Sequence, residues 1–110
     1  PDDQEDGSFT IGAIAVDPAA LSASCGQLSV ELKRRDVALL RLFKREAGRI
    51  VSRRQLLQEV WEVAHPEMLE TRSVDMHLVK LRRRLQGLQL EREVIETVRG
   101  EGYRLAEGLS

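Results

Sequence analysis

Hydrophobic residues recur at strand-like spacing in the first third of the chain. Short apolar stretches lie between Phe9 and Val30, separated by Gly12, by Asp17-Pro18 and by Cys25-Gly26. Turn residues at such close intervals predict an antiparallel meander of short strands. The four expected strands cover residues 9–11, 14–16, 21–24 and 28–30.

From Arg35 to Gly87 the apolar spacing is helical and predicts three helices. The first ends at Gly48, and its inward positions are Val37, Leu39, Leu40, Phe43 and Ala47. Ile50-Val51 then forms a short extended bridge. Ser52 begins the second helix as its N-cap, with the Gln55 side chain reaching back in a capping box. This second helix carries Leu56, Leu57, Val60 and Trp61, and a third helix is expected over residues 71–86.

The last segment, residues 94–105, has two β-branched and aromatic stretches around Gly100-Glu101-Gly102. This pattern predicts a β-hairpin with a glycine turn. Three helices followed by a hairpin indicate a winged helix, which is a helix-turn-helix variant with a β-wing. The expected fold class is therefore α+β, with an N-terminal four-stranded antiparallel sheet, three helices and a C-terminal wing.

The expected helix 71–86 has an apolar stripe on one side and a cationic face on the other. The stripe consists of Val74, Leu78, Leu81 and Leu85. The opposite side consists of Arg72, Met76, Lys80 and Arg83, with Ser73 and Arg84 at its edge. Such a face suits a helix that lies in a DNA groove, although basic helix faces are also common on ordinary solvated surfaces.

The formal net charge of −1 does not by itself indicate a nucleic-acid binder, but the charges are unevenly distributed. Residues 1–31 contain six acidic side chains and neither lysine nor arginine, whereas residues 71–86 contain five basic side chains and one acidic one. Salt screens charges beyond a Debye length of ~8–10 Å. The acidic N-terminal third therefore does not preclude DNA binding by the helix.

Composition narrows the class of protein. A length of 110 residues suits one domain with a modest core. We find no run of membrane-spanning length and no secretory signal, and the single cysteine, Cys25, is compatible with a reducing cytosol. The sequence lacks a glycine-rich phosphate loop, metal-ligand spacing and the order of a nucleophilic triad. We therefore expect no enzyme activity, no cofactor and no metal site.

Several segments together carry a family likeness. In chain order they are Phe9-Thr-Ile-Gly, Ala38-Leu-Leu-Arg-Leu, residues 48–57, Val60-Trp61, residues 72–77, Leu81-Arg-Arg and residues 97–105. In this order and spacing the chain resembles the DNA-binding output domains of OmpR/PhoB-type two-component response regulators, over about residues 9–105. The resemblance implies an output domain at 9–106, a flexible acidic linker at 1–8 and a tail at 107–110.

This family consists of bacterial, cytoplasmic transcription regulators that bind promoter DNA. The resemblance implies sequence-specific double-stranded DNA binding, with helix 71–86 in the major groove and the 94–105 wing on the adjacent minor groove or backbone. It also implies an N-terminal receiver domain that takes part in a phosphorelay, and a homodimer on direct-repeat half-sites about 10–10.5 bp apart. The resemblance also implies RNA polymerase as a partner, and it implies no interaction with a membrane.

Three residues are expected to touch base edges. Lys80 is the first choice, because it faces outward in mid-helix and can donate to guanine; its other interpretation is a solvated lysine. Ser73 can reach a base, or can serve as a helix cap, as can Thr71. Met76, with Val79 beside it, can pack on thymine methyl groups, or is scattered surface hydrophobicity. Family members often have arginine at the positions of Val79 and Lys80.

A second group is expected to contact phosphates or the DNA backbone: Trp61, Arg72, His77, Arg83, Arg84, Thr97, Arg99 and Tyr103. The roles of Trp61, His77, Thr97 and Tyr103 come from the resemblance. A structural histidine at 77, a core anchor at Trp61 and an inward-facing Tyr103 remain open alternatives. Asp75 is expected to favour the helix N-terminus and to orient a nearby arginine.

Two features depart from the family. Lys33-Arg34 stands where a Thr-Pro cap is usual, which removes a cap acceptor at a cost of ~1 kcal/mol that Asp36 partly offsets. The loop 62–70 is longer than in many members. The resemblance assigns its residues His65, Glu67, Met68 and Leu69 to a contact with RNA polymerase, although Met68 and Leu69 can equally fold back on the core.

A winged helix that binds protein is the alternative function. The low net charge, the acidic N-terminal part and the apolar pair Met76 and Val79 favour it. A stable dimer through this helix, indifferent to DNA, would distinguish it from a DNA-binding regulator.

Overall fold

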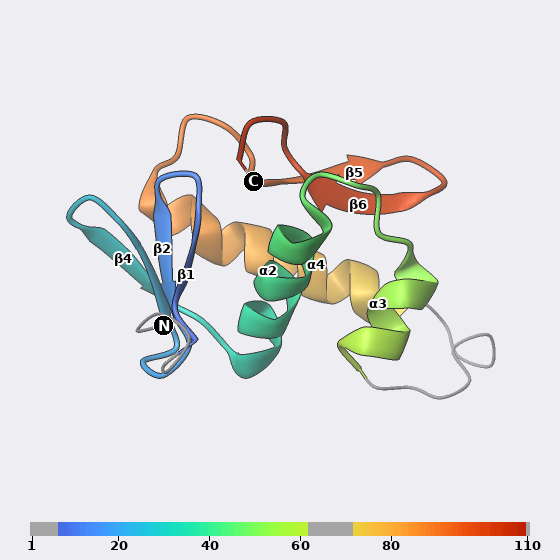
Figure 1. Cartoon of the computed structure of the whole chain (residues 1–110), viewed down its shortest axis with the longest axis horizontal. Coiled ribbons are helices and arrows are strands. Elements are labelled where there is room, and N and C mark those ends of the chain that lie inside the picture. Colours follow the sequence, from blue (N-terminus) through green and yellow to red (C-terminus); the bar gives the residue numbers. More distant parts are fainter. Residues whose placement is uncertain (1–6, 62–71, 110) are drawn as a thin grey trace.

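A four-stranded sheet forms the N-terminal end of the fold (Figure 1). The computed structural model describes residues 7–61 and 72–109. The strands are β1 (Phe9–Ile11), β2 (Ile14–Asp17), β3 (Ser22–Cys25) and β4 (Leu28–Glu31). They pair antiparallel in the order β1-β2-β3-β4, with Phe9 opposite Val16 and Ala23 opposite Val30. The predicted meander is confirmed to within one residue at each strand end.

Helix α2 (Arg34–Glu46) packs its apolar side into the core. Its buried apolar residues are Val37, Leu39, Leu40, Leu42 and Phe43. The expectation that Ala47 faces inward is wrong: Ala47 is the C-cap, exposed and left-handed with φ of 52°. At the other end Lys33 is the N-cap, and Asp36 Oδ2 accepts the Lys33 backbone N–H at 2.8 Å. In a capping box the side chain at the third helical position accepts the N–H of the N-cap residue, and Asp36 makes this hydrogen bond here.

Helix α3 (Arg53–Glu59) begins as the sequence predicts, because Ser52 Oγ accepts the Gln55 N–H at 3.0 Å. The return half of the predicted capping box is wrong. Gln55 Nε2 donates instead to Glu59 Oε2, at 2.8 Å, one turn further along the helix. Trp61 lies two residues beyond the end of α3 rather than within it.

Helix α4 (Arg72–Leu85) buries the apolar stripe that the sequence predicts, namely Val74, Leu78, Leu81 and Leu85. A 3₁₀ turn, η2 (Gln86–Leu88), extends it and inserts Leu88 into the core. Gly87 therefore lies within this turn instead of ending the helix abruptly. A Cβ at Gly87 would meet the Val30 side chain, so this glycine lets η2 approach β4 closely.

The last two strands, β5 (Ile95–Val98) and β6 (Gly102–Leu105), form the predicted hairpin. Val51 adds an isolated antiparallel bridge to Tyr103, with reciprocal backbone hydrogen bonds of 2.7 and 2.9 Å. Gly102 has a φ of +146°, and a Cβ there would collide with the Val51 carbonyl oxygen. The β6 strand is thereby joined, close to the turn of the hairpin, to the connection between α2 and α3.

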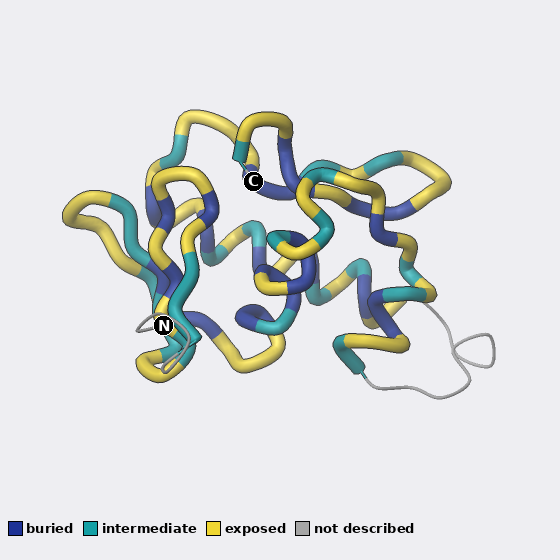
Figure 2. Tube along the Cα trace, viewed as in Figure 1, coloured by how far each residue is buried: buried dark blue, intermediate teal, exposed yellow. Residues whose placement is uncertain are grey.

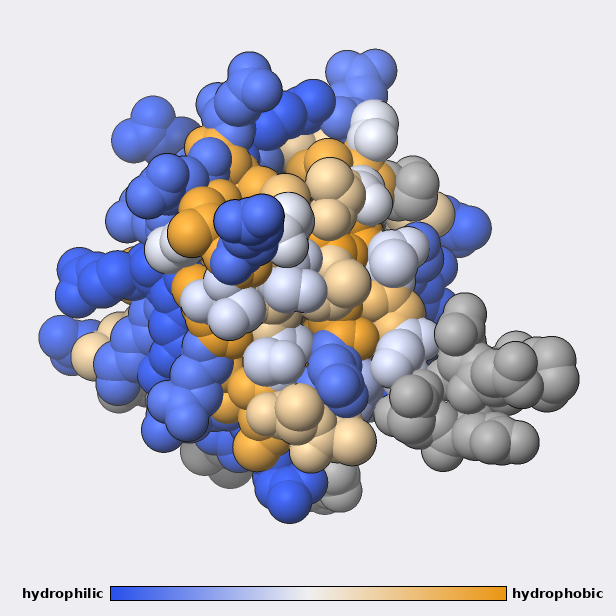
Figure 3. All heavy atoms as spheres, turned by 90° about the vertical axis from the view of Figure 1, so that its left-hand side faces the viewer, coloured by the Kyte–Doolittle hydropathy of each residue, from blue (hydrophilic) through white to orange (hydrophobic). Residues whose placement is uncertain are grey.

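The elements form an elongated body in which α4 links the sheet at one end to the hairpin at the other (Figure 1). The buried residues gather along α2, α4 and the inner sides of the strands (Figure 2). Figure 3 faces the sheet end, where hydrophobic and near-neutral residues lie among hydrophilic ones. Leu109, which the sequence assigns to a tail, packs against this core. Within residues 7–61 and 72–109, no helix is suited to crossing a membrane.

Candidate nucleic-acid interface

The outward face of α4 is open to solvent along its length. Arg72, Ser73, Met76, Val79, Lys80 and Arg83 are all exposed. Met76 and Val79 keep 53% and 50% of their surface exposed, which is unusual for apolar side chains in the middle of a helix. The face therefore combines cations with an apolar centre, and the three predicted base-contacting residues lie on it together.

On one side of α4, a buried carboxylate ties the helix to α2. Asp36 has no exposed surface, and its side chain is hydrogen-bonded to Lys33, His77 and Arg84. His77 Nε2 lies 2.8 Å from Asp36 Oδ1, and Arg84 Nη1 donates to Asp36 Oδ2 at 2.8 Å. We call these four residues the Asp36 cluster. Its ion pair compensates the desolvation of a carboxylate that would otherwise be very costly to bury.

Trp61 and Arg35 extend this side of the helix. The Trp61 ring meets the His77 ring edge to face, with centroids 5.7 Å apart, and the Arg35 guanidinium lies 4.6 Å from the Trp61 centroid. Trp61 is half-buried against the core. His77 and Arg84 are thus both bonded to Asp36 inside the protein. Only the parts of their side chains that remain exposed are available for the expected phosphate contacts.

On the other side of α4, a half-exposed carboxylate ties the helix to α3 and to the wing. Asp75 Oδ1 accepts hydrogen bonds from Arg53 Nε at 2.6 Å and from the Tyr103 hydroxyl at 2.5 Å. The guanidinium groups of Arg53 and Arg82 lie 5.2 and 5.3 Å from the Tyr103 ring centroid. We call Arg53, Asp75, Arg82 and Tyr103 the Asp75 cluster. The expected pairing of Asp75 with an arginine is present, and the partner is Arg53.

The electrostatics of the Asp75 cluster follow from these contacts. The hydrogen bond to Asp75 raises the pKa of Arg53 above its ordinary value, so Arg53 stays charged. Burial, and secondarily the hydrogen bond to Asp75, raises the pKa of Tyr103 above its ordinary value of 10. Tyr103 therefore remains a neutral donor at physiological pH.

Arg82 links α4 directly to the wing. Its Nε donates to the Ile95 carbonyl at 3.1 Å, and its Nη2 donates to Thr97 Oγ1 at 2.7 Å. Thr97 is exposed, with its hydroxyl already accepting this bond. Tyr103 is 4% exposed and directs its hydroxyl to Asp75. Of the two open interpretations of Tyr103, the inward one holds, because the side chain is buried and its hydroxyl is bonded to Asp75.

The wing tip carries the remaining predicted contact. Arg99 is exposed and directly follows β5. Its neighbour Gly100 has a φ of +80°, with open space around it. Arg99 therefore has room to approach a neighbouring surface. The polymerase-contact residues His65, Glu67, Met68 and Leu69 lie outside the described residues.

Sequence reasoning did not identify Arg53 and Arg82 as parts of this site. Asp75 and Arg82 are seven residues apart and so share one side of a helix, a spacing that could have grouped them. Arg53 is 22 residues from Asp75 in sequence, and no local pattern joins the two.

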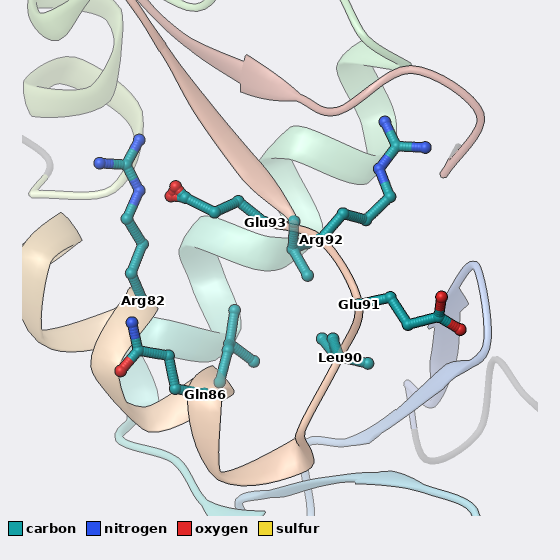
Figure 4. Close-up of a pocket in the computed structure, with 8 residues that line it drawn as sticks. Arg82, Gln86, Leu90, Glu91, Arg92 and Glu93 are labelled. Atoms are coloured by element: carbon teal, nitrogen blue, oxygen red, sulfur yellow. The ribbon is translucent and has the colours of Figure 1, made fainter.

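A cleft of about 260 Å³ lies between the end of α4 and the segment that leads into β5 (Figure 4). Leu85, Leu90 and Val94 give it an apolar floor, and four charged side chains surround it: Arg82, Glu91, Arg92 and Glu93. Within the part of the chain that the structure describes, no group of three or more metal-ligating side chains occurs. The α4 face, which gathers the predicted base-contacting residues, is the candidate site.

A four-stranded sheet, three helices with the last one exposed, and a C-terminal β-hairpin define a winged-helix domain of the DNA-binding type. A family model described as "Transcriptional regulatory protein, C terminal" matches residues 26–105. The chain belongs to this family of response-regulator C-terminal domains.

Known relatives agree with this assignment. The chain is 34% identical over 102 residues to the transcriptional regulatory protein VxrB of Vibrio cholerae, covering 93% of this chain and 39% of VxrB. It is 38% identical over 92 residues to the response regulator protein PmrA of Pseudomonas aeruginosa, covering 84% of this chain and 38% of PmrA. The chain thus spans about two fifths of the length of these relatives.

A solved structure supports the same conclusion. The DNA-binding domain of Klebsiella pneumoniae RstA, in complex with the RstA box, superposes with a TM-score of 0.73 at 30% identity. The match covers 90% of this chain and 96% of that one. The predicted fold class and family are confirmed.

Proposed function

We propose that this chain is the sequence-specific, double-stranded DNA-binding output domain of a two-component response regulator. One observation carries the proposal: α4 presents an uncovered cationic face while its leucines are buried in the core. A helix held in this way fits the major groove of B-DNA, and the wing then lies against the adjacent minor groove or backbone. The likeness to RstA, whose domain was solved with its DNA box, supports this mode of binding.

The proposed roles divide by position on α4 and the wing. Lys80, Ser73 and Met76 contact base edges. Arg72, Arg83 and Arg99 are exposed and contact phosphates or enter the minor groove. The exposed edges of Trp61, His77, Arg84 and Thr97 add backbone contacts. Tyr103 and Arg82 hold the wing in place and act through their neighbours.

The wider context is part of the same proposal. The full-length protein carries a receiver domain before this one, acts in the cytoplasm and binds direct repeats as a homodimer. Its half-sites lie about one helical turn apart, ~10–10.5 bp between centres. RNA polymerase is the proposed protein partner at the promoter.

Selection of bound sequences from a random duplex pool, followed by fluorescence anisotropy across a range of salt concentrations, tests the proposal. We expect a steep fall in affinity with salt, because phosphate contacts release counterions. Arg72→Ala and Arg83→Ala should each reduce the salt slope by about 0.9. Arg92→Ala removes an exposed arginine that lies outside the outward face of α4 and should leave the slope unchanged. A flat slope for the unmodified chain would contradict the proposal.

The exposed pair Met76 and Val79 favours one competing function, a winged helix that binds another protein. Measurement of the molecular mass in solution, with and without duplex DNA, distinguishes the two. A dimer that forms through α4 and persists both on dilution and on addition of DNA would support the protein-binding function.

A further inference from the structure

The centre of the α4 face is apolar, although cations surround it. On a helical projection Met76 points almost directly away from the buried stripe, and Val79 and Lys80 lie at similar angles on either side of it. Arg72 stands one turn before Met76, and Arg83 stands one turn after Val79. Midway along the helix, a thioether and an isopropyl group would therefore meet a docked ligand together with the Lys80 ammonium.

Two of the neighbouring cations, Arg82 and Arg84, are held to the sides of the helix and do not cover Met76 and Val79. On one side Arg84 is paired with buried Asp36, and on the other Arg82 is hydrogen-bonded to Ile95 and Thr97. Met76 and Val79 consequently stay half exposed. A second copy of this face would be a poor partner, because two helices that each carry five cations and one acid would repel one another.

Base-edge chemistry then limits what can lie opposite these two side chains. An aliphatic group leaves a buried base donor or acceptor without a hydrogen bond, at a real energetic cost. Thymine alone among the four DNA bases presents a methyl group in the major groove. The Cα atoms of Met76 and Val79 are about 4.5 Å apart along the helix axis, close to the spacing of about 3.4 Å between base pairs.

We infer that Met76 and Val79 form a two-residue apolar reader that selects thymines at neighbouring base pairs of the half-site. This inference rests on the proposed DNA binding and deepens it, because it names the chemistry that is read. At position 79 the face offers the methyl groups of a valine and no cation. Lys80, on the far side of Met76, donates to a guanine next to the thymines.

Deoxyuridine substitution tests this reader, because uracil lacks only the thymine methyl and keeps every hydrogen-bonding group. Using the 110-residue chain and a duplex chosen by selection, each thymine of a half-site is replaced by deoxyuridine in turn. We expect the dissociation constant to rise about fourfold at two neighbouring positions, the value for one buried methyl group. Met76→Ala should abolish the uracil effect at one position and Val79→Ala at the other.

Leu28→Ala is the matched control, because Leu28 is an exposed apolar residue of β4, away from the α4 face. It should keep both uracil effects, and all three variants should keep the same salt slope. Specific binding without any uracil effect, or uracil effects that survive both α4 substitutions, would overturn the reader while leaving DNA binding intact. Absence of DNA binding by the unmodified chain would overturn the proposed function and the reader together.

Discussion

Two aspartates hold the two sides of α4, and they do so in different surroundings. Asp36 has a completely buried side chain and joins α4 to the start of α2 through His77 and Arg84. The Asp75 side chain is 41% exposed and joins α4 to α3 and the wing through Arg53 and Tyr103. Both carboxylates accept hydrogen bonds from more than one donor. The Asp36 side chain is shielded from solvent, whereas the Asp75 side chain is partly exposed to it.

This difference separates two tasks. Removing one partner from a buried ion pair leaves an uncompensated charge, whereas a half-exposed group can turn to water. We therefore expect the Asp36 cluster to contribute to global stability by adding a buried ion pair to the apolar contacts that hold α4 on the body of the domain. The Asp75 cluster determines how the wing is oriented relative to α4, with a smaller effect on global stability.

The largest expected effect comes from Asp36→Ala. His77 and Arg84 would lose their shared acceptor, and α2 would lose the acceptor for its Lys33 N–H. We expect the free energy of unfolding to fall by about 3 kcal/mol, the lower end for a broken buried pair, because both partners retain some exposure. Urea unfolding followed by circular dichroism measures this, with Glu107→Ala as the exposed control. If Asp36→Ala and Glu107→Ala had the same free energy of unfolding, the Asp36 cluster would not contribute more to stability than an exposed residue does.

A smaller and more local effect is expected from Arg82→Ala. The wing would lose two hydrogen bonds to α4, at about 1 kcal/mol each at most. Amide hydrogen exchange should become faster in β5 and β6 and remain unchanged in α2. Affinity for a selected DNA duplex should fall about tenfold, since 1.4 kcal/mol corresponds to that factor.

Arg104→Ala is the matched comparison for Arg82→Ala. The Arg104 Nε donates to Glu96 Oε1 at 3.1 Å, so this ion pair lies within the hairpin and not between the hairpin and α4. Removing it should leave the orientation of the wing and its exchange rates close to those of the unmodified chain. Faster exchange in α2 on loss of Arg82 would show that the two clusters are not separate.

The smallest expected effect comes from Tyr103→Phe, which keeps the ring between the guanidiniums and removes only the donor to Asp75. We expect a loss of about 1 kcal/mol in the free energy of unfolding near neutral pH. Because the pKa of Tyr103 is raised in the folded state, its contribution is complete below pH 10 and is lost as the pH rises through the folded-state value. Tyr103→Phe should lack this part of the alkaline destabilisation.

The chain contains one tyrosine, so ultraviolet absorbance of the tyrosinate follows Tyr103 alone. Asp75→Asn should shift this titration toward lower pH, because the carboxylate is the second cause of the raised pKa after burial. An unchanged titration would mean that Asp75 and Tyr103 are not coupled in solution.

The sequence predicted the elements well because their signals are local. Period-two and helical spacing located every strand and α-helix of the described residues, but not the 3₁₀ turn η2, and the serine cap located the start of α3. The buried stripe of α4, and hence its exposed face, followed from the same spacing. These features depend on residues a few positions apart.

The connections between elements were the part that local patterns could not supply. Asp36 and Arg84 are 48 residues apart, and Asp75 and Tyr103 are 28 apart. The cationic helix face suggested that Arg84 contacts DNA, and a family likeness suggested the same for Tyr103. The fold directs Arg84 to a buried carboxylate and Tyr103 inward. Gln55 shows the same limit at short range, because Glu59 competes for its side chain.

The joint between Gly102 and the Val51 carbonyl has a consequence for how this domain can be modified. At that joint any side chain collides with backbone, whereas the turn at residues 99–101 projects beyond it, with open space around Gly100. Position 102 of the hairpin is therefore restricted to glycine, whereas the turn at residues 99–101 has room for other sequences. We expect that another glycine-containing turn grafted at 99–101 would change the tip of the hairpin without disturbing α4.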